Sequence, residues 1–306
     1  MVQQLSDFNG PTLKDAPFGT RPFAFVLSGG AALGSWQGGV LCALAQEHGW
    51  KAHSIVGTSA GAINGAAYLQ GDLDKLKELW RSIPRNRFMK WSFGVAPPRV
   101  FSLDSVREYL TEVIDEKLCR ERKRCWFYPV SSDLANGETL QAEFSPEADG
   151  PWQGPLVDKV LGSMAVPFLF PPARVPHEDP AKRDRVLVDG HVTSRLFLDR
   201  LAVRGVLDFV FLNVISDREM NTPRYSPRGF IGTLIHQLLN AQVENGLESL
   251  RFGFKEKGIR AFLLRPSKPL KVSVFKFDKD ECRGAFDLGI NDACRWGESQ
   301  ESTRIL

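Results

Sequence analysis

The segment of residues 54–65, SIVGTSAGAING, constrains the fold of this chain more than any other. It begins with a short β-branched run typical of a buried strand and ends with small residues typical of a closely packed helix. Between these parts, Gly57, Ser59 and Gly61 form a Gly-x-Ser-x-Gly sequence, the pattern of a nucleophile elbow between a strand and a helix. We therefore expect Ser59 to be a nucleophile at the tip of a tight turn. The alternative is a plain turn in which Ser59 caps the helix.

A second glycine-rich turn lies one strand–helix unit upstream. Residues 23–28 form an apolar run typical of a buried strand, and residues 29–34, GGAALG, lead into a predicted helix. The spacing is close to the dinucleotide-binding Gly-x-Gly-x-x-Gly pattern, but Ala31 stands at the middle glycine. No acidic residue follows about 20 residues later, where a ribose contact would need one. Nucleotide binding is therefore disfavoured.

An oxyanion hole is the better interpretation of this turn. Acyl transfer develops negative charge on the former carbonyl oxygen, and fixed backbone N–H groups stabilise that charge. The turn can supply such groups from Gly29, Gly30 and Ala31. The amide of Ala60, directly after Ser59, is the expected donor from the elbow itself.

A third feature is the run of residues 185–191, RVLVDGH. An apolar strand ends here at Asp189, and Gly190 follows as a turn residue, which places the carboxylate at a sheet edge where open α/β proteins bind ligands. An Asp-Gly pair alone usually marks only a turn. It gains weight because a serine nucleophile needs a base, and no histidine has a convincing triad position. The histidines are His48, His53, His177, His191 and His236.

Taken together, these pieces resemble the patatin-like phospholipase family in their nature and order. The matching segments are Ser28 to Gly34 for the oxyanion loop, Gly57 to Gly61 for the elbow, residues 162–172, residues 189–191 for the Asp-Gly-Gly or Asp-Gly-Ala motif, and residues 286–293. The resemblance spans about residues 23–297. It implies a three-layer α/β/α fold with a mostly parallel central sheet.

The resemblance implies a lipid acyl hydrolase, a phospholipase or esterase with Ser59 as nucleophile and Asp189 as proton acceptor in a catalytic dyad. The acyl-enzyme is then hydrolysed by water, without a metal or cofactor. Ala31 departs from the family pattern where a third glycine is usual, and His191 where Gly or Ala is usual. We expect His191, as a neighbour of Asp189 in the chain, to point away from it. The alternatives are a conventional Ser-His-Asp esterase, with His191 or His236 as the histidine, and a catalytically silent lipid-binding or scaffold protein.

Composition agrees with a cytoplasmic globular enzyme. The 306 residues, 43% of them hydrophobic, are enough for one large domain, which we expect over residues 21–300 after a flexible segment 1–20. The net charge of +3 is too small to indicate nucleic acid binding. Five cysteines without a disulfide framework predict reduced thiols. No apolar run reaches the ~18 residues of a membrane span, so we expect any membrane contact to be peripheral. The sequence leaves the oligomeric state open.

Helices and strands alternate along the rest of the chain. Helices are predicted at 74–83, 104–116, 155–164 and 231–255, and strands at 125–130, 139–144, 186–188, 209–214 and 259–264, with a turn at Asn136-Gly137. Residues 88–98 combine aromatic and basic residues, as an interfacial loop does. Because most aromatic clusters are core, we expect this stretch to be buried. Residues 166–172 are expected to line the acyl pocket.

Overall fold

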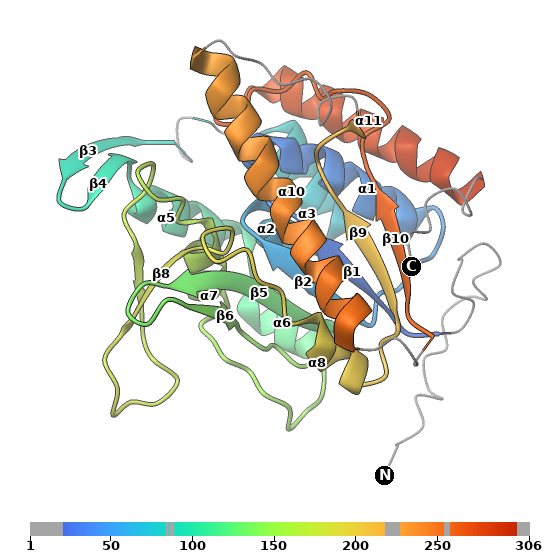
Figure 1. Cartoon of the computed structure of the whole chain (residues 1–306), viewed down its shortest axis with the longest axis horizontal. Helices are drawn as coiled ribbons and strands as arrows, with labels where there is room; N and C mark the ends of the chain where they lie inside the picture. Colours follow the sequence, from blue (N-terminus) through green and yellow to red (C-terminus); the bar gives the residue numbers. More distant parts are fainter. Residues whose placement is uncertain (1–20, 84, 86–88, 218–226, 254–257, 299–306) are drawn as a thin grey trace.

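A mixed, mostly parallel sheet forms the centre of the protein (Figure 1). The computed structural model describes residues 21–83, 85, 89–217, 227–253 and 258–298, and the expected flexible segment 1–20 lies outside them. Within these residues the strand order is β10-β9-β1-β2-β5-β8-β7, with β6 paired to β5. The strands are β1 (Phe23–Leu27), β2 (Ser54–Thr58), β5 (Trp126–Asp133), β6 (Glu138–Gln141), β7 (Ala173–Val175), β8 (Arg185–Asp189), β9 (Asp208–Leu212) and β10 (Arg260–Leu264).

The strands β10, β9, β1, β2 and β5 run parallel, whereas β6 and β8 pair with β5 in the antiparallel direction. Every residue of β1, β2 and β9 is buried. Strands covered on both faces need continuous apolar runs, and this is what made them recognisable in the sequence. The predicted mostly parallel sheet is confirmed.

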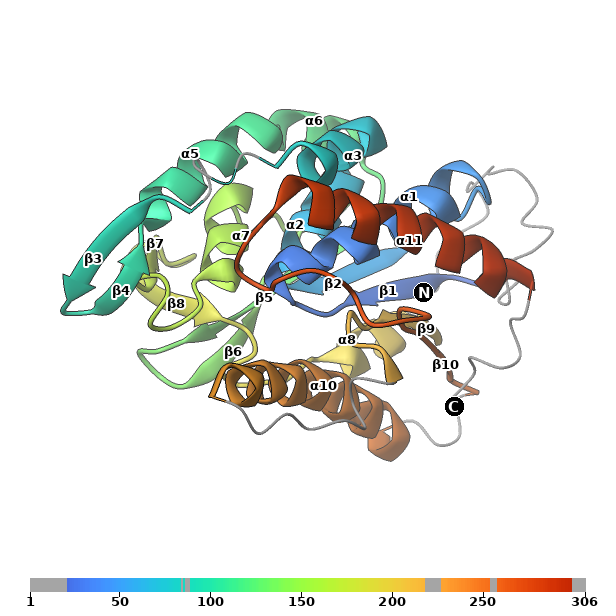
Figure 2. The same ribbon diagram turned by 90° about the horizontal axis from the view of Figure 1, so that it is seen from above.

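Helices cover both faces of the sheet (Figure 2). On one face, Phe25 of β1 packs into a core with α1, α2, α3, α5, α7 and α11, and on the other Val26 packs with α8 and α10. The bounds are η1 (Ala31–Leu33), α1 (Gly34–Gln46), α2 (Ala60–Gln70), α3 (Leu73–Arg81), α5 (Leu103–Val113), α6 (Glu116–Arg122), α7 (Leu156–Met164), α8 (Leu198–Val203), α10 (Pro227–Gly253) and α11 (Lys279–Glu298). Because adjacent strand residues enter different cores, the fold has three layers, α/β/α, as predicted.

Some elements differ from the prediction. The helix expected over 104–116 ends earlier, at Val113, and a separate helix α6 follows, because Asp115 caps it by accepting a hydrogen bond from Leu118 N–H. The helix α11 was not predicted. It packs closely on α1, since a Cβ at Gly39 would lie 2.0 Å from the carbonyl oxygen of Phe286. Within the described residues, no helix combines the length and apolar character needed to cross a bilayer.

A separate two-stranded hairpin, β3 (Trp91–Val95) and β4 (Pro98–Phe101), projects from the body of the molecule (Figure 1). The expectation that residues 88–98 are buried is wrong for most of the described part, 89–98; residue 88 lies outside it. Trp91, Phe93 and Val95 are 62%, 75% and 90% exposed. They alternate along one strand and therefore share one side of the hairpin, which the described part of the chain leaves uncovered.

Candidate active site

Ser59 occupies a sharp turn between β2 and α2. The strand ends at Thr58 and the helix begins at Ala60, and Ser59 between them has φ 54° and ψ −120°. Such a backbone conformation is rare for a residue with a side chain and is found where surrounding structure enforces it, often at functional sites. The side chain of Ser59 makes no capping hydrogen bond to α2, contrary to the alternative of a simple helix cap.

The glycines beside Ser59 lie where backbone segments touch. A Cβ at Gly57 would be 2.5 Å from the carbonyl oxygen of Gly61. A Cβ at Gly61 would be 2.4 Å from the carbonyl oxygen of Leu27, at the end of β1. The elbow is therefore packed directly against the strand that leads into the glycine-rich turn. A Cβ at Gly34 would be 2.6 Å from the Cβ of Ala60, so α1 and α2 also begin in contact.

A buried hydroxyl holds the elbow from the other side. The amide of Ser59 donates to Ser163 Oγ at 2.9 Å, and Ser163 Oγ donates to the carbonyl oxygen of Val130 at 2.5 Å. Ser163 lies on α7 and is fully buried, and Val130 lies on β5. Ser163 thus ties the strained turn to the neighbouring strand. Ser163 belongs to the segment 162–172 that resembles the family, but no role was predicted for it.

The glycine-rich turn leaves backbone amides available. The amide of Ala32 donates to Val274 and that of Leu33 to Gly30, both at 3.0 Å. By contrast, the amides of Gly29, Gly30 and Ala31 have no acceptor in the described part of the chain. Unpaired N–H groups beside a nucleophile are what an oxyanion hole requires.

The conformation of this turn depends on positive φ angles. Gly30 has φ 146°, and Ala31 has φ 48°, which a residue with a Cβ rarely adopts. Ala60 supplies a further amide from the elbow, because the first N–H groups of a helix have no acceptor within the helix. Gly30 and Ala31 line one cavity with Ser59, and Ala60 lines the hollow beside it.

A chain of buried polar side chains fixes the turn relative to the elbow. Gln37 Nε2 donates to the carbonyl oxygens of Ser28 at 3.2 Å and Leu212 at 2.9 Å. Asn64 Nδ2 donates to Gln37 Oε1 at 2.9 Å, and Trp80 Nε1 donates to Asn64 Oδ1 at 2.7 Å. Gln37 and Asn64 are fully buried. Neither residue was predicted from the sequence, although an amide side chain within a helix of small, apolar residues is a usable signal.

Strand register brings Asp189 to the elbow. Thr58 of β2 pairs with Val130 of β5, and the next residue, Ser131, pairs with Asp189 of β8. Asp189 therefore lies at the same level of the sheet as Ser59, with β5 between them. The strand β8 is antiparallel to β5 and pairs with the last residues of β5. Asp189, at the end of β8, therefore lies near the carboxyl ends of the parallel strands. Beyond Asp189, a Cβ at Gly190 would be 2.6 Å from the carbonyl oxygen of Val130.

His191 faces Asp189, and the expectation that it points away is wrong. Its Nδ1 lies 2.7 Å from Asp189 Oδ1, and its backbone N–H donates to the same oxygen at 2.9 Å. Side chains two residues apart in a strand lie on the same side, so strand alternation does not separate His191 from Asp189. A Cβ placed on Gly29 would be 2.2 Å from His191 Cε1 and 2.9 Å from Ser59 Cβ, so the imidazole lies close to the serine. His191 Nε2 is buried without a partner in the described part of the chain.

Ser59, Asp189 and His191 line one cavity of about 200 Å³. Its other lining residues are mostly apolar: Gly30, Ala31, Val166, Pro167, Val192, Leu238, Leu239, Val274 and Phe275. A smaller hollow continues from Ser59 toward Ile63, Met164 and Phe170. The segment 166–172, expected to line an acyl pocket, thus contributes Val166, Pro167 and Phe170. An apolar cavity with a few polar groups at one end suits an acyl chain and its ester.

The other histidines lie away from this cavity lining. His177 Nδ1 accepts a hydrogen bond from the amide of Asp179 in a surface loop, and His236 lies on α10. No cysteine of the described residues lines the cavity, and burial raises the pKa of Cys42, Cys119, Cys125 and Cys282 to about 12. Ser59 is the nucleophile candidate that the cavity contains.

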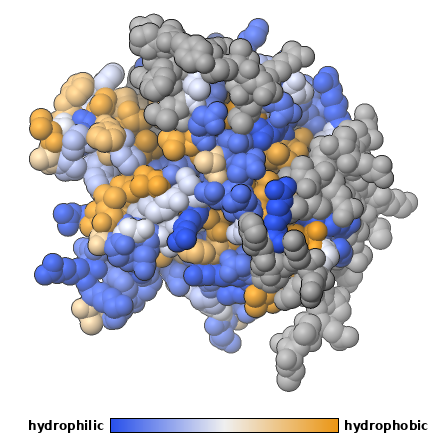
Figure 3. Space-filling view, in the orientation of Figure 1, coloured by the Kyte–Doolittle hydropathy of each residue, from blue (hydrophilic) through white to orange (hydrophobic). Residues whose placement is uncertain are grey.

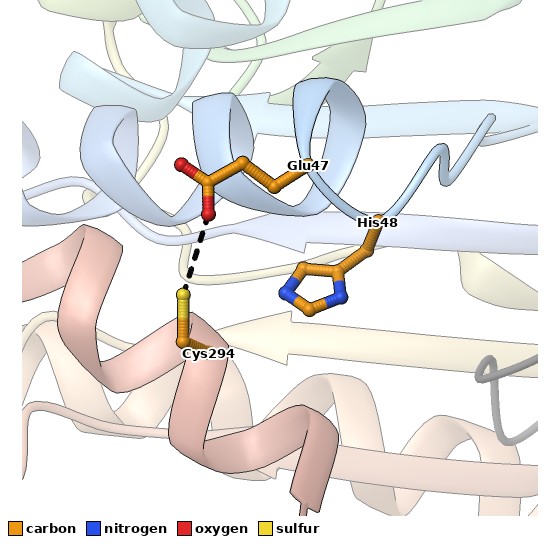
Figure 4. Close-up of side chains that lie close together, drawn as sticks. All are labelled: Glu47, His48 and Cys294. Carbon is orange, nitrogen blue, oxygen red and sulfur yellow. Dashed lines mark hydrogen bonds between the residues drawn. The ribbon is translucent and has the colours of Figure 1, made fainter.

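Three potential metal ligands meet at the far end of α1 (Figure 4). Cys294 Sγ of α11 donates to Glu47 Oε2 at 3.4 Å, and the ring of His48 lies beside them. Chain spacing gave no sign of this group, because Cys294 is remote in the sequence. The 13 residues of α1 span about 20 Å, so the group lies far from the glycine-rich turn. It has three donors, whereas a closed structural zinc site uses four.

Comparison with known proteins identifies the family. A family model for patatin-like phospholipases matches residues 25–202, which is more than half of the chain. The chain therefore belongs to the patatin-like phospholipase family. Among solved structures, the crystal structure of VipD from Legionella pneumophila aligns with a TM-score of 0.46 and 15% identity, over 94% of this chain and 68% of that chain. A search of curated proteins gave no match. Membership of the family supports lipid acyl hydrolysis as the activity.

Proposed function

We propose that this protein hydrolyses fatty acyl esters of lipids, with Ser59 as nucleophile and Asp189 as proton acceptor. The observation that carries the proposal is the strained elbow of Ser59, which opens into an apolar cavity that also contains Asp189. A backbone held in such a conformation exposes the hydroxyl to a substrate. The glycine-rich turn, with its unpaired amides, lines the same cavity, and such amides can stabilise the oxyanion that forms during acyl transfer.

The reaction proceeds in two balanced steps. Ser59 Oγ attacks the ester carbonyl carbon while Asp189 takes the hydroxyl proton, and the amides of Gly30, Ala31 and Ala60 stabilise the oxyanion. The carbon–oxygen bond to the alcohol then breaks, and the alcohol leaves with the proton from Asp189. Water attacks the acyl-enzyme by the same route, which releases the fatty acid and restores Ser59.

A second assignment of the base is supported by His191. Its Nδ1 contacts Asp189 and its Nε2 has no partner in the described residues, which is the arrangement of the histidine in a Ser-His-Asp triad. In that scheme His191 Nε2 takes the proton from Ser59, and Asp189 orients the imidazole. Asp189 is needed in both schemes, whereas His191 is needed only in the second.

Three single variants separate the possibilities on a p-nitrophenyl acyl ester. Ser59→Ala abolishes turnover and labelling by a fluorophosphonate probe if Ser59 is the nucleophile. Asp189→Asn lowers kcat by ~10³-fold or more in either scheme, as loss of a base or of its orienting partner does. If the dyad operates, the activity of His191→Ala stays within about tenfold of wild type. If the triad operates, its kcat falls as far as that of Asp189→Asn. Full activity of Ser59→Ala would refute the proposal, and wild-type protein that neither turns over nor labels would favour the silent lipid-binding alternative.

A further inference from the structure

The exposed side of the β3–β4 hairpin is an aromatic surface. Trp91 stacks on Phe93 with ring centroids 5.3 Å apart, and Trp91 also contacts Phe101 at 4.9 Å. Figure 3 shows hydrophobic atoms gathered on this projecting part of the molecule. We call the side chains of Trp91, Phe93 and Val95 the hairpin patch. Contiguous exposed apolar groups of this kind mark interaction sites.

The hairpin patch is connected to the wall of the cavity. The amides of Val100 and Phe101 in β4 both donate to the carbonyl oxygen of Leu169, at 3.1 and 2.9 Å. Leu169 belongs to the segment whose Val166 and Pro167 line the cavity beside Ser59. The hairpin is therefore hydrogen-bonded to the segment that forms one wall of the cavity.

Further apolar side chains continue the surface toward the cavity. Phe168, next to Leu169, is 73% exposed and has φ 69°, so a strained backbone holds an aromatic ring in solvent. Val192 and Leu238 line the cavity and are about half exposed. Apolar groups thus lie on the hairpin, on the adjoining loop and at the cavity mouth.

The hairpin and its immediate flanks in the sequence are basic, and the first acidic residue after them is Asp104. Residues 82–103 contain four basic residues and no acidic residue. They are Arg85, Arg87, Lys90 and Arg99. Arg85 and Lys90 are exposed and Arg99 is half-buried, while residue 87 lies outside the described part. Basic residues beside exposed aromatic rings complement a membrane interface, where the rings enter the headgroup region and the cations meet anionic lipid.

We propose that the hairpin patch inserts into the surface of an anionic lipid bilayer and brings the cavity mouth against it. This inference rests on the proposed function, because its purpose is to deliver an acyl chain from the bilayer to Ser59. We assign a bilayer as the partner, since the basic residues match its anionic headgroups and the apolar side chains match the apolar region below them. Docking by the hairpin places the loop with Phe168 at the same surface, so a lipid tail passes directly into the apolar cavity.

Vesicle flotation tests the docking independently of catalysis. The Ser59→Ala protein is mixed with vesicles of phosphatidylcholine alone or with one quarter phosphatidylglycerol, and the bound fraction is measured. We expect binding to the anionic vesicles, and a loss of at least tenfold when Trp91→Ser and Phe93→Ser are added. Val203→Ser is the matched control, because Val203 is 73% exposed on α8, away from the hairpin. It should leave binding unchanged.

Thermal unfolding of each variant shows whether it is folded. Equal binding of the hairpin variant and the Ser59→Ala parent, failure of the parent to bind anionic vesicles, or equally strong binding to phosphatidylcholine alone would each overturn the proposal. Retained docking of the hairpin variant would point to a protein partner for the patch. Because the flotation uses a protein without its nucleophile, a negative result here says nothing against ester hydrolysis. Conversely, if the wild-type protein shows no esterase activity, flotation still tests whether the hairpin patch binds the bilayer.

Discussion

The hydroxyl of Ser163 offers the sharpest test of how the elbow is held. Ser163 is fully buried, and its Oγ is the acceptor for the amide of Ser59. The change Ser163→Ala leaves that buried N–H without a partner, which costs ~1–3 kcal/mol. The elbow conformation that this bond supports is itself strained by an amount of order 1–3 kcal/mol. We therefore expect the free energy of unfolding to fall by about 1–3 kcal/mol.

Catalysis should fall together with stability. A relaxed elbow no longer presents Oγ to the oxyanion amides, and each 1.4 kcal/mol lost in the transition state costs a factor of ten in rate. We expect kcat on a p-nitrophenyl ester to fall about 10- to 100-fold in Ser163→Ala, with a smaller change in KM. Urea unfolding and steady-state kinetics measure the two effects on the same preparation.

Ser105→Ala is the matched control for this experiment. Ser105 is also buried, and its Oγ donates to the carbonyl oxygen of Ser102 at 3.0 Å at the start of α5, away from the elbow. This control loses a buried hydroxyl without touching Ser59. If Ser163→Ala is as active and as stable as Ser105→Ala, the view that Ser163 holds the elbow is incorrect.

Three further variants test other parts of the structure. Ala31→Gly removes a Cβ at φ 48° and should raise the free energy of unfolding by ~1 kcal/mol in urea; a decrease would contradict this reading. Gly61→Ala puts a Cβ 2.4 Å from the carbonyl at the end of β1, so it should displace the glycine-rich turn and lower kcat by ~10²–10³-fold; unchanged kcat would disprove that coupling. Burial raises the pKa of Glu178, but hydrogen bonds from Lys159 and Arg185 outweigh it and lower that pKa to about 2. This carboxylate therefore stabilises the fold above pH ~4.5 and loses its effect as the pH falls toward 2, so Glu178→Gln should flatten the acid dependence of the unfolding midpoint.

The local parts of the site could be read from the sequence, because their chemistry lies in adjacent residues. The glycines of the elbow and the turn mark contacts between backbones, and the apolar runs before them mark strands buried on both faces. The predicted turn at Asn136-Gly137 joins β5 to β6, with Gly137 at φ 72°. Each of these features is decided within a few residues.

The rest depends on packing between distant segments. Asp189 reaches Ser59 through the register of an antiparallel strand, which no local pattern encodes. Ser163 lies 104 residues after Ser59 and meets it only in the folded chain. The burial expected for Trp91 failed for a related reason: an aromatic stretch is core only if another element covers it, and the sequence of the stretch does not say whether one does.

The position of β8 near one side of the sheet has a consequence for how the protein loses activity. Only the three-residue strand β7 lies beyond it, whereas β2 is enclosed by β1 and β5. Border strands separate from a sheet more readily than central ones, so mild denaturant should first detach the carboxylate and leave the serine in place. Under such conditions the protein would keep most of its helical signal while turnover had already ceased, and dilution would restore turnover without refolding of the whole chain.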